Sequence, residues 1–287
     1  MPGAAASFID ALPGRDTFAY VNAFTFYNGD ADVSRQLPVG GLLAANMDAT
    51  VYADTSVFLR QTRKKLFGGL YAAAVAVPYV WMTVDASVSV GSGTVQRSSS
   101  VNGIGDIEIM PLMLGWTKGD VNYGGWLGIY APTGDYEEGR LANVGKNYWT
   151  FEPTYYVSQI DTKTGMEFSA FAGLDFNTKN GATDYRSGDA FHIDVTMAQH
   201  VPKYDGLFGF GANVFYCKQI TGDSGSGARL GDFGGNTFGF GPVLSYATKT
   251  GRKKTTDLVA ELKWLPELDA TRRLKGDTIW FKVGLAF

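Results

Sequence analysis

Two histidines are the residues of this chain whose chemistry is easiest to recognise. His192 and Asp194 are two positions apart, so on an extended strand their side chains share one face, about 7 Å apart. A histidine beside a carboxylate is the general-base pair of hydrolases, which also need a nucleophile within hydrogen-bond reach. No spacing singles out a serine for that role, and His200 lies farther along the same segment. The enzyme alternative therefore depends on His192 and Asp194, and we expect no catalytic residue.

The composition excludes several other kinds of site. One cysteine is too few for a disulfide framework or a structural zinc site. No glycine-rich phosphate loop is followed by a helical pattern. A net charge of −3 over 287 residues provides no basic surface for nucleic acid. We expect no metal, no cofactor and no nucleic-acid partner.

The elements that would position these side chains are strands. The chain is rich in glycine (37 residues) and in aromatic residues (14%), which favours β-structure. Apolar residues alternate with polar or small ones over 149–158, 166–176, 191–198, 208–216, 238–246, 257–264 and 278–287. The expected strands that contain these alternating stretches run to roughly 10–14 residues, and a tilted strand crosses a bilayer in roughly 9–11. Aromatic residues near the ends of the apolar face are typical of outer-membrane barrels. A large soluble β-sandwich or barrel is the alternative.

Turn-forming clusters divide the chain into twelve expected strands, an even number as in bacterial outer-membrane barrels. The strands are expected to begin near Asp16, Ala45, Leu70, Gly105, Asn122, Asn147, Met166, Ala190, Leu207, Asn236, Thr255 and Asp277. Short periplasmic turns are predicted at 63–65, 119–120, 161–165, 203–206 and 250–254. Longer outer loops are predicted at 30–43, 87–102, 137–146, 179–189, 221–235 and 266–276. The predicted fold is an all-β, closed antiparallel transmembrane β-barrel of twelve strands over residues 16–287.

We expect this barrel in the bacterial outer membrane. No stretch reaches the roughly 20 apolar residues of a transmembrane helix, and no signal peptide is present in this chain. The expected partners are outer-membrane lipid, lipopolysaccharide and small-molecule solutes, with the barrel acting as a monomer.

Strand alternation also predicts which side chains line the lumen. The polar set is Asp48, Asp54, Glu108, Glu152, Glu167, Asp175, His192, Asp194, Glu261, Lys263 and Lys282. The aromatic set is Tyr52, Trp126, Tyr130, Tyr156, Phe171, Phe215 and Trp280. Acidic residues outnumber basic ones, so an open pore should prefer cations. The aromatic side chains either contact small aromatic solutes or only fill space.

Two further features bear on the route of a solute. Residues 1–15 precede the first strand and contain Phe8, Ile9 and Leu12, which are poorly suited to free solvent. We expect this periplasmic segment to insert into the lumen as a plug, with a disordered tail as the alternative. Prolines inside or at the ends of strands predict bulges of the wall or a side opening, because proline cannot donate to the ladder. These prolines are Pro78, Pro111, Pro132, Pro153 and Pro242.

Several short motifs occur in a recognisable order. They are Val77–Tyr79, Gly103–Asp106 followed by Pro111, Ala131–Tyr136, Asn147–Pro153 and the terminal Phe287. Together they resemble the outer-membrane channels of the MetA-pathway of phenol degradation (SphA-like) family. The resemblance spans residues 16–287 and implies a Gram-negative channel, often encoded beside genes for degrading aromatic or other hydrophobic compounds. It brings no catalytic residues.

The sequence thus predicts passive uptake of small molecules, aromatic or otherwise hydrophobic. The route is through the lumen past the N-terminal segment or through a gap in the wall near the prolines. An outer-membrane hydrolase and a structural or adhesion barrel without transport are the alternatives.

Overall fold

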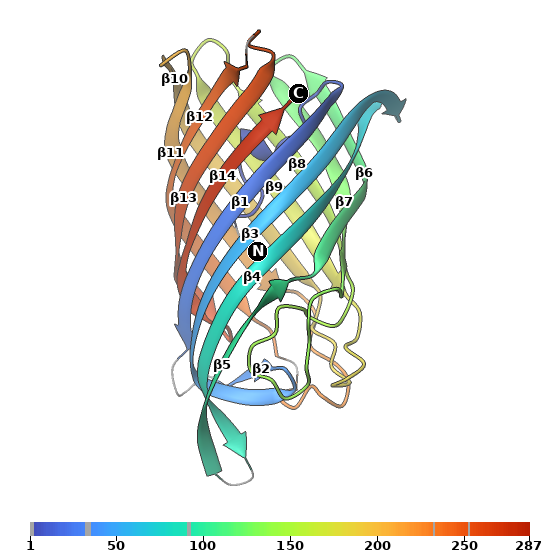
Figure 1. Ribbon diagram of the computed structural model, residues 1–287, viewed down its shortest axis with the longest axis vertical. Helices are drawn as coiled ribbons and strands as arrows, with labels where there is room; N and C mark the ends of the chain where they lie inside the picture. Colours follow the sequence, from blue (N-terminus) through green and yellow to red (C-terminus); the bar gives the residue numbers. More distant parts are fainter. Residues whose placement is uncertain (1–2, 32–35, 91–92, 232, 252) are drawn as a thin grey trace.

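The computed structural model describes residues 3–31, 36–90, 93–231, 233–251 and 253–287. One antiparallel sheet forms nearly all of it (Figure 1). The elements are η1 (Phe8–Asp10), β1 (Thr17–Ala31), β2 (Leu37–Val39), β3 (Leu42–Leu66), β4 (Gly69–Val90), β5 (Gly93–Ile104), β6 (Ile107–Lys118), β7 (Val121–Ala131), β8 (Thr150–Ile160), β9 (Met166–Asn177), β10 (Ala190–Lys203), β11 (Gly206–Gln219), β12 (Asn236–Thr250), β13 (Thr256–Thr271) and β14 (Lys275–Ala286). No helix among these residues is long and apolar enough to cross a membrane.

The sheet closes on itself. Its order runs from β3 through β1 and β14 back to β6 and β4, and β3 also pairs with β4. Twelve strands therefore form the barrel, which confirms the predicted fold. The remaining two are outside the ring, since β2 pairs with β3 and β5 pairs with β4. In Figure 1 the short turns and the C-terminus lie at the upper rim, and the longer loops lie at the lower rim.

The barrel strands begin within a few residues of the predicted positions, but three expected connections are strand instead. Residues 93–102 were expected in a loop and belong to β5, which pairs with the outer half of β4. Its exposed residues are mostly serine, threonine and other polar types, so alternation of apolar residues gives no signal. β3 continues through 63–65, and β13 continues to Thr271.

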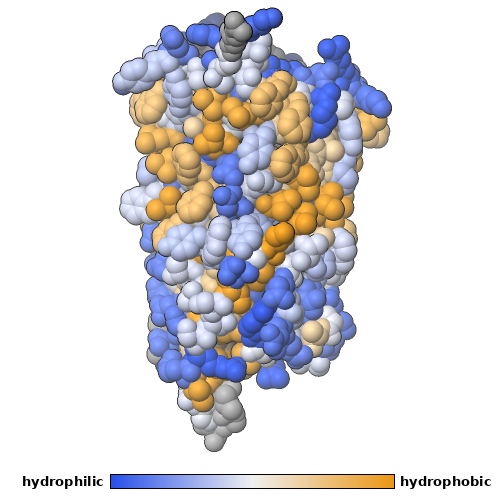
Figure 2. All heavy atoms as spheres, in the orientation of Figure 1, coloured by the Kyte–Doolittle hydropathy of each residue, from blue (hydrophilic) through white to orange (hydrophobic). Residues whose placement is uncertain are grey.

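The outer face of the barrel is apolar around its circumference. Large side chains on this face are between 37% and 59% exposed. They include Phe24, Tyr155, Phe210, Phe240, Trp264 and Phe281. Figure 2 shows such residues gathered over the upper half of the barrel, with hydrophilic residues toward both ends. An outward apolar band on a closed barrel is the surface that lipid covers, so this is an integral protein of the bacterial outer membrane.

The prolines have different effects on the wall. Pro111 lies within a register shift between β6 and its neighbours. Pro78, Pro153 and Pro242 instead pair in regular register with one neighbouring strand. Pro132 directly follows the end of β7. A strand residue points its N–H to one neighbour only, so a proline can remove one ladder bond without shifting the register.

A glycine on the inner face of β12 tests how tightly this wall is packed. A Cβ added at Gly241 would lie 1.8 Å from the carbonyl oxygen of Trp264. We expect Gly241→Ala to destabilise the barrel by about 1–3 kcal/mol, because backbone must move to admit the methyl group. Urea unfolding in detergent measures this. Gly181→Ala is the control, since a Cβ there meets nothing within 4 Å. Equal stability of the two variants would contradict the prediction.

Candidate functional site

Cross-strand pairs of the barrel place most of the predicted lining residues on its inner face. The polar ones are Glu108, Glu152, Glu167, Asp175, His192, Asp194, Glu261, Lys263 and Lys282. The aromatic ones are Trp126, Tyr130, Tyr156, Phe171, Phe215 and Trp280. Paired residues of neighbouring strands share a face, so the alternation read from the sequence continues from β6 to β14.

The predicted orientation is wrong on β3. Tyr52 pairs with Phe26 and packs against Phe24 on the lipid-facing side, and Asp54 pairs with Phe24. Asp48 has the same parity and is exposed. All three side chains therefore point outward.

The physical reason lies on the other face of β3. Val57 and Leu59 face inward and pack against the cluster that contains Leu12. The apolar side of this strand is thus covered by protein rather than lipid.

The beginning of the chain lies against this inner wall. We call residues 3–15 the N-terminal segment. The backbone N–H of Gly3 donates to Oδ1 of Asp194 on β10 at 2.7 Å, and Nζ of Lys263 on β13 donates to the Gly3 carbonyl at 2.6 Å. Nζ of Lys282 on β14 donates to the carbonyl of Ala4.

A buried ionic cluster holds the next turn of the segment. Nζ of Lys282 lies 2.6 Å from Oδ1 of Asp10, and Nζ of Lys263 lies 3.0 Å from Oε1 of Glu261. The Ser7 hydroxyl donates to Glu261. Asp10 also accepts from the backbone N–H of Ser7, so each charge has a partner of opposite sign or a hydrogen-bond donor.

Sequence reasoning missed Ser7 and Asp10 as wall contacts. Their spacing of three residues resembles a capping box at a helix start. This spacing was the feature of the sequence that could have indicated an ordered turn here.

Two apolar side chains of the segment contact the wall farther on. The ring of Phe8 meets that of His200 edge-on at 5.1 Å, and its backbone N–H donates to Glu167 at 2.8 Å. Glu167 also lies 2.7 Å from Nε2 of His200. Leu12 is 4% exposed, and its N–H donates to the Tyr156 hydroxyl at 3.3 Å. Ile9, the third residue of the predicted plug, is half-buried.

The segment leaves the lumen at the rim that carries the short turns. Gly14 N–H donates to the side chain of buried Gln61 at 3.0 Å, and Arg15 pairs with Asp257. Asp16 lies 2.6 Å from Arg60 and 3.0 Å from Arg63. Its hydrogen bond with Arg60 lowers the pKa of the Asp16 carboxyl below its usual value. The carboxylate therefore stays ionised at neutral pH.

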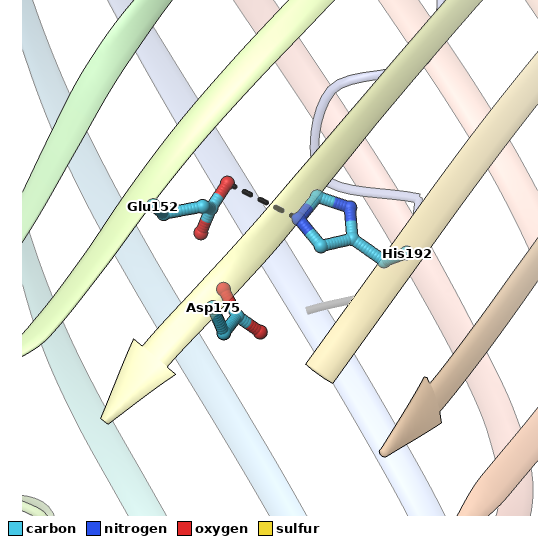
Figure 3. Close-up of side chains that lie close together, drawn as sticks. All are labelled: Glu152, Asp175 and His192. Atoms are coloured by element: carbon cyan, nitrogen blue, oxygen red, sulfur yellow. Dashed lines mark ion pairs between the residues drawn. The ribbon is translucent and has the colours of Figure 1, made fainter. Parts of the chain in front are cut away.

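The hydrolase pair suggested by the sequence does not assemble. Asp194 bonds to Gly3. His192 instead turns its Nε2 toward Oε1 of Glu152 on β8, at 3.4 Å. Asp175 on β9 lies beside both, and Figure 3 shows the three side chains pointing toward one another. Cys217 pairs with His192 across β10 and β11.

This outer part of the lumen is acidic. Glu108 on β6 pairs with Tyr130 on β7 on the same face, and β7 pairs in turn with β8, which carries Glu152. The pKa of Lys146, in the loop before β8, is affected by these carboxylates. Burial lowers its pKa, but the nearby Tyr148 hydroxyl and the carboxylates of Asp175, Asp106 and Glu152 outweigh burial and raise it above the usual value. Lys146 is therefore fully charged and balances only part of the acidic group.

A cavity of about 410 Å³ opens at the loop end of the barrel. Apolar side chains make up much of its lining, among them Val39, Leu42, Met82, Val84 and Leu141. Several belong to, or pack against, a buried apolar cluster that also contains Met47. The cavity can therefore hold an apolar group close to the mouth of the lumen.

Comparisons with known proteins agree with this architecture. Residues 22–283 match the family described as "Putative MetA-pathway of phenol degradation". No curated protein matches the chain.

Among solved structures, the fold is similar to that of an outer membrane channel from Pseudomonas putida F1. The TM-score is 0.66 at 13% identity, over 100% of this chain and 99% of that one. The β-domain of the Bordetella autotransporter Brka has a TM-score of 0.49 at 11% identity, over 95% of this chain and 99% of that one. A TM-score of this size is too low to relate the two folds. The first similarity establishes the fold, and the sequence match spans most of the chain. The chain therefore belongs to the family of the MetA-pathway of phenol degradation.

Proposed function

We propose that this protein is a monomeric outer-membrane channel that passively admits small aromatic or other hydrophobic solutes, and that its N-terminal segment closes the lumen. The family match and the channel-like barrel support the general role. The observation that carries the gating part is the set of bonds from residues 3–14 to inward side chains of β3, β8, β9, β10, β13 and β14.

The solute class is supported by two regions along the lumen. The cavity at the outer mouth is lined by apolar side chains. Deeper inside, the rings of Trp126, Tyr156 and Phe171 contact one another at centroid distances of 5.4–6.1 Å. Aromatic faces stack favourably with planar solutes. The acidic residues between these regions favour solutes that are neutral or positively charged.

The route is the lumen, and no enzymatic step is needed. Passage requires only that the N-terminal segment moves aside, which makes two states of one protein. A route through the wall is the alternative, near the point where β4 changes its partner from β6 to β5 around Pro78. The two routes differ in whether a fixed segment stops transport.

A reversible lock distinguishes the two routes. A Cβ added at Gly115 lies 3.3 Å from the Cβ of Leu12, close to the roughly 3.5–4.5 Å of a disulfide. In a Cys217→Ser background, Leu12→Cys with Gly115→Cys should form a bond that ties the segment to β6. We expect proteoliposomes containing the oxidised protein to admit the aromatic cation phenyltrimethylammonium several-fold more slowly than after reduction.

The control is Gly115→Cys with Cys217→Ser, whose uptake should not respond to reductant. Equal uptake by the oxidised and reduced double-cysteine protein would overturn the lumen route. Uptake no faster than in protein-free vesicles, after reduction, would overturn the channel itself.

A further inference from the structure

Among the described residues, the outer lumen contains a set of side chains that do not bond to residues 3–15. Glu152, Asp175 and His192 come from the adjacent strands β8, β9 and β10, and each offers a ligand atom within 4.8 Å of the other two. Their inward direction is set by strand pairing, since His192 pairs with Gly173 and Thr154 with the same glycine. The three groups therefore sit on a rigid wall, facing one another across it (Figure 3).

We propose that Glu152, Asp175 and His192 form a binding site for one divalent transition-metal ion, of which Zn²⁺ is the representative. A histidine and two carboxylates are a ligand set that suits zinc and similar ions, with a position left open to water. With one cysteine, the sequence has no cysteine-rich metal-binding pattern, and no metal site was expected from it. The ligands here are separated by 23 and 17 positions, and only the barrel brings them together.

The distances are close to those that an ion needs. Ligand atoms about 2.0–2.2 Å from a tetrahedral ion lie roughly 3.3 Å from one another. The atoms Nε2 of His192 and Oε1 of Glu152 are already 3.4 Å apart. Asp175 receives no hydrogen bond from any other residue that the structure describes, so its carboxylate is free to rotate toward an ion.

A missing side chain leaves room for the ion-binding nitrogen. A Cβ added at Gly173 would lie 2.3 Å from Nε2 of His192. The imidazole thus lies over the bare backbone of β9 and faces the carboxylates of Glu152 and Asp175 (Figure 3). Glu152 also accepts a hydrogen bond from the Thr154 hydroxyl at 3.0 Å, which orients its carboxylate. One divalent ion would neutralise the two carboxylates.

Calorimetric titration of the folded, full-length protein in detergent with ZnCl₂ tests the site directly. We expect one ion per chain. His192→Ala and Asp175→Asn should each weaken zinc binding by more than about 100-fold, because outer-shell changes alone cost 10–100-fold. Gly173→Ala should weaken it as well, by displacing the imidazole. The titration reads metal binding whether or not the barrel conducts, so its failure would leave the proposed channel function standing.

Two comparisons make the result specific. His200→Gln is the matched control, because it removes the other histidine and should leave zinc affinity unchanged. Co²⁺ should give visible absorption bands in the unmodified protein that disappear in His192→Ala. Absence of zinc binding, equal affinity in His192→Ala, loss of affinity only in His200→Gln, or equally tight binding of Mg²⁺ would each overturn the proposal. Folding of each variant is checked by the temperature at which its compact electrophoretic form is lost.

Discussion

A protein that lacks residues 1–15 is expected to conduct several-fold more current through single channels in a planar bilayer than the full chain does. The N-terminal segment contacts side chains on opposite parts of the wall, from Gln61 on β3 to Asp194 on β10. A twelve-stranded barrel is wider than the eight-stranded barrels that side chains fill. Removing the segment should therefore leave a passage filled with water.

The barrel itself should survive this deletion. Its twelve strands pair with one another and not with the segment. The charges that the segment covers, such as Lys263, Lys282 and Glu261, become hydrated instead of remaining buried. Unchanged thermal stability of the compact electrophoretic form is the control for folding. Equal conductance of the two proteins would show that residues 1–15 are a tail without a gating role.

Lys282→Met is expected to release the N-terminal segment without removing any of it. Nζ of Lys282 is bonded to the carbonyl of Ala4 and to Oδ1 of Asp10, and it lies 3.6 Å from Oε1 of Glu261. The lysine is 3% exposed. Removing one member of a buried ion pair costs about 3–5 kcal/mol because the other charge stays uncompensated. Asp10 escapes this cost only if the segment leaves the lumen.

This free energy corresponds to a shift of roughly 100-fold or more between the closed and open states. The measurement is the fraction of time that single channels spend open. Lys179→Met is the matched control, because Lys179 pairs with Asp184 in an outer loop, 56% and 43% exposed, and neither residue contacts the N-terminal segment. An exposed pair contributes about 1 kcal/mol or less, so gating should barely change. Identical open fractions for Lys282→Met and the unmodified protein would contradict the prediction.

Many features of the barrel wall could be predicted from the alternation of apolar and polar residues along each strand. The twelve barrel strands begin close to the predicted residues, because each must present an apolar face to lipid and end at a turn. From β6 to β14 the alternation also predicts the inner face, including Glu261, Lys263 and Lys282. On these strands lipid covers the outer face, so polarity alone identifies it.

The direction of side chains was predicted wrongly where protein, and not lipid, covers the apolar face of a strand. On β3 the inward residues Val57 and Leu59 are apolar because they pack against the N-terminal segment, and outward Asp54 hydrogen-bonds to Asn22. The strand β5 was not predicted because it lacks an alternation of apolar and polar residues. It lies outside the barrel ring and has no apolar face to read.

Local patterns of residues were enough to predict the class of fold, the number of barrel strands and the membrane in which they lie. Strand length follows from the thickness of the bilayer, and alternation follows from lipid on one face and a polar lumen on the other. Which side chains meet inside the lumen follows from the folded barrel. Gly3 bonds to Asp194 across 191 positions, and Glu152 approaches His192 from two strands away. Such contacts depend on closure of the barrel, which brings together positions that are far apart in the sequence.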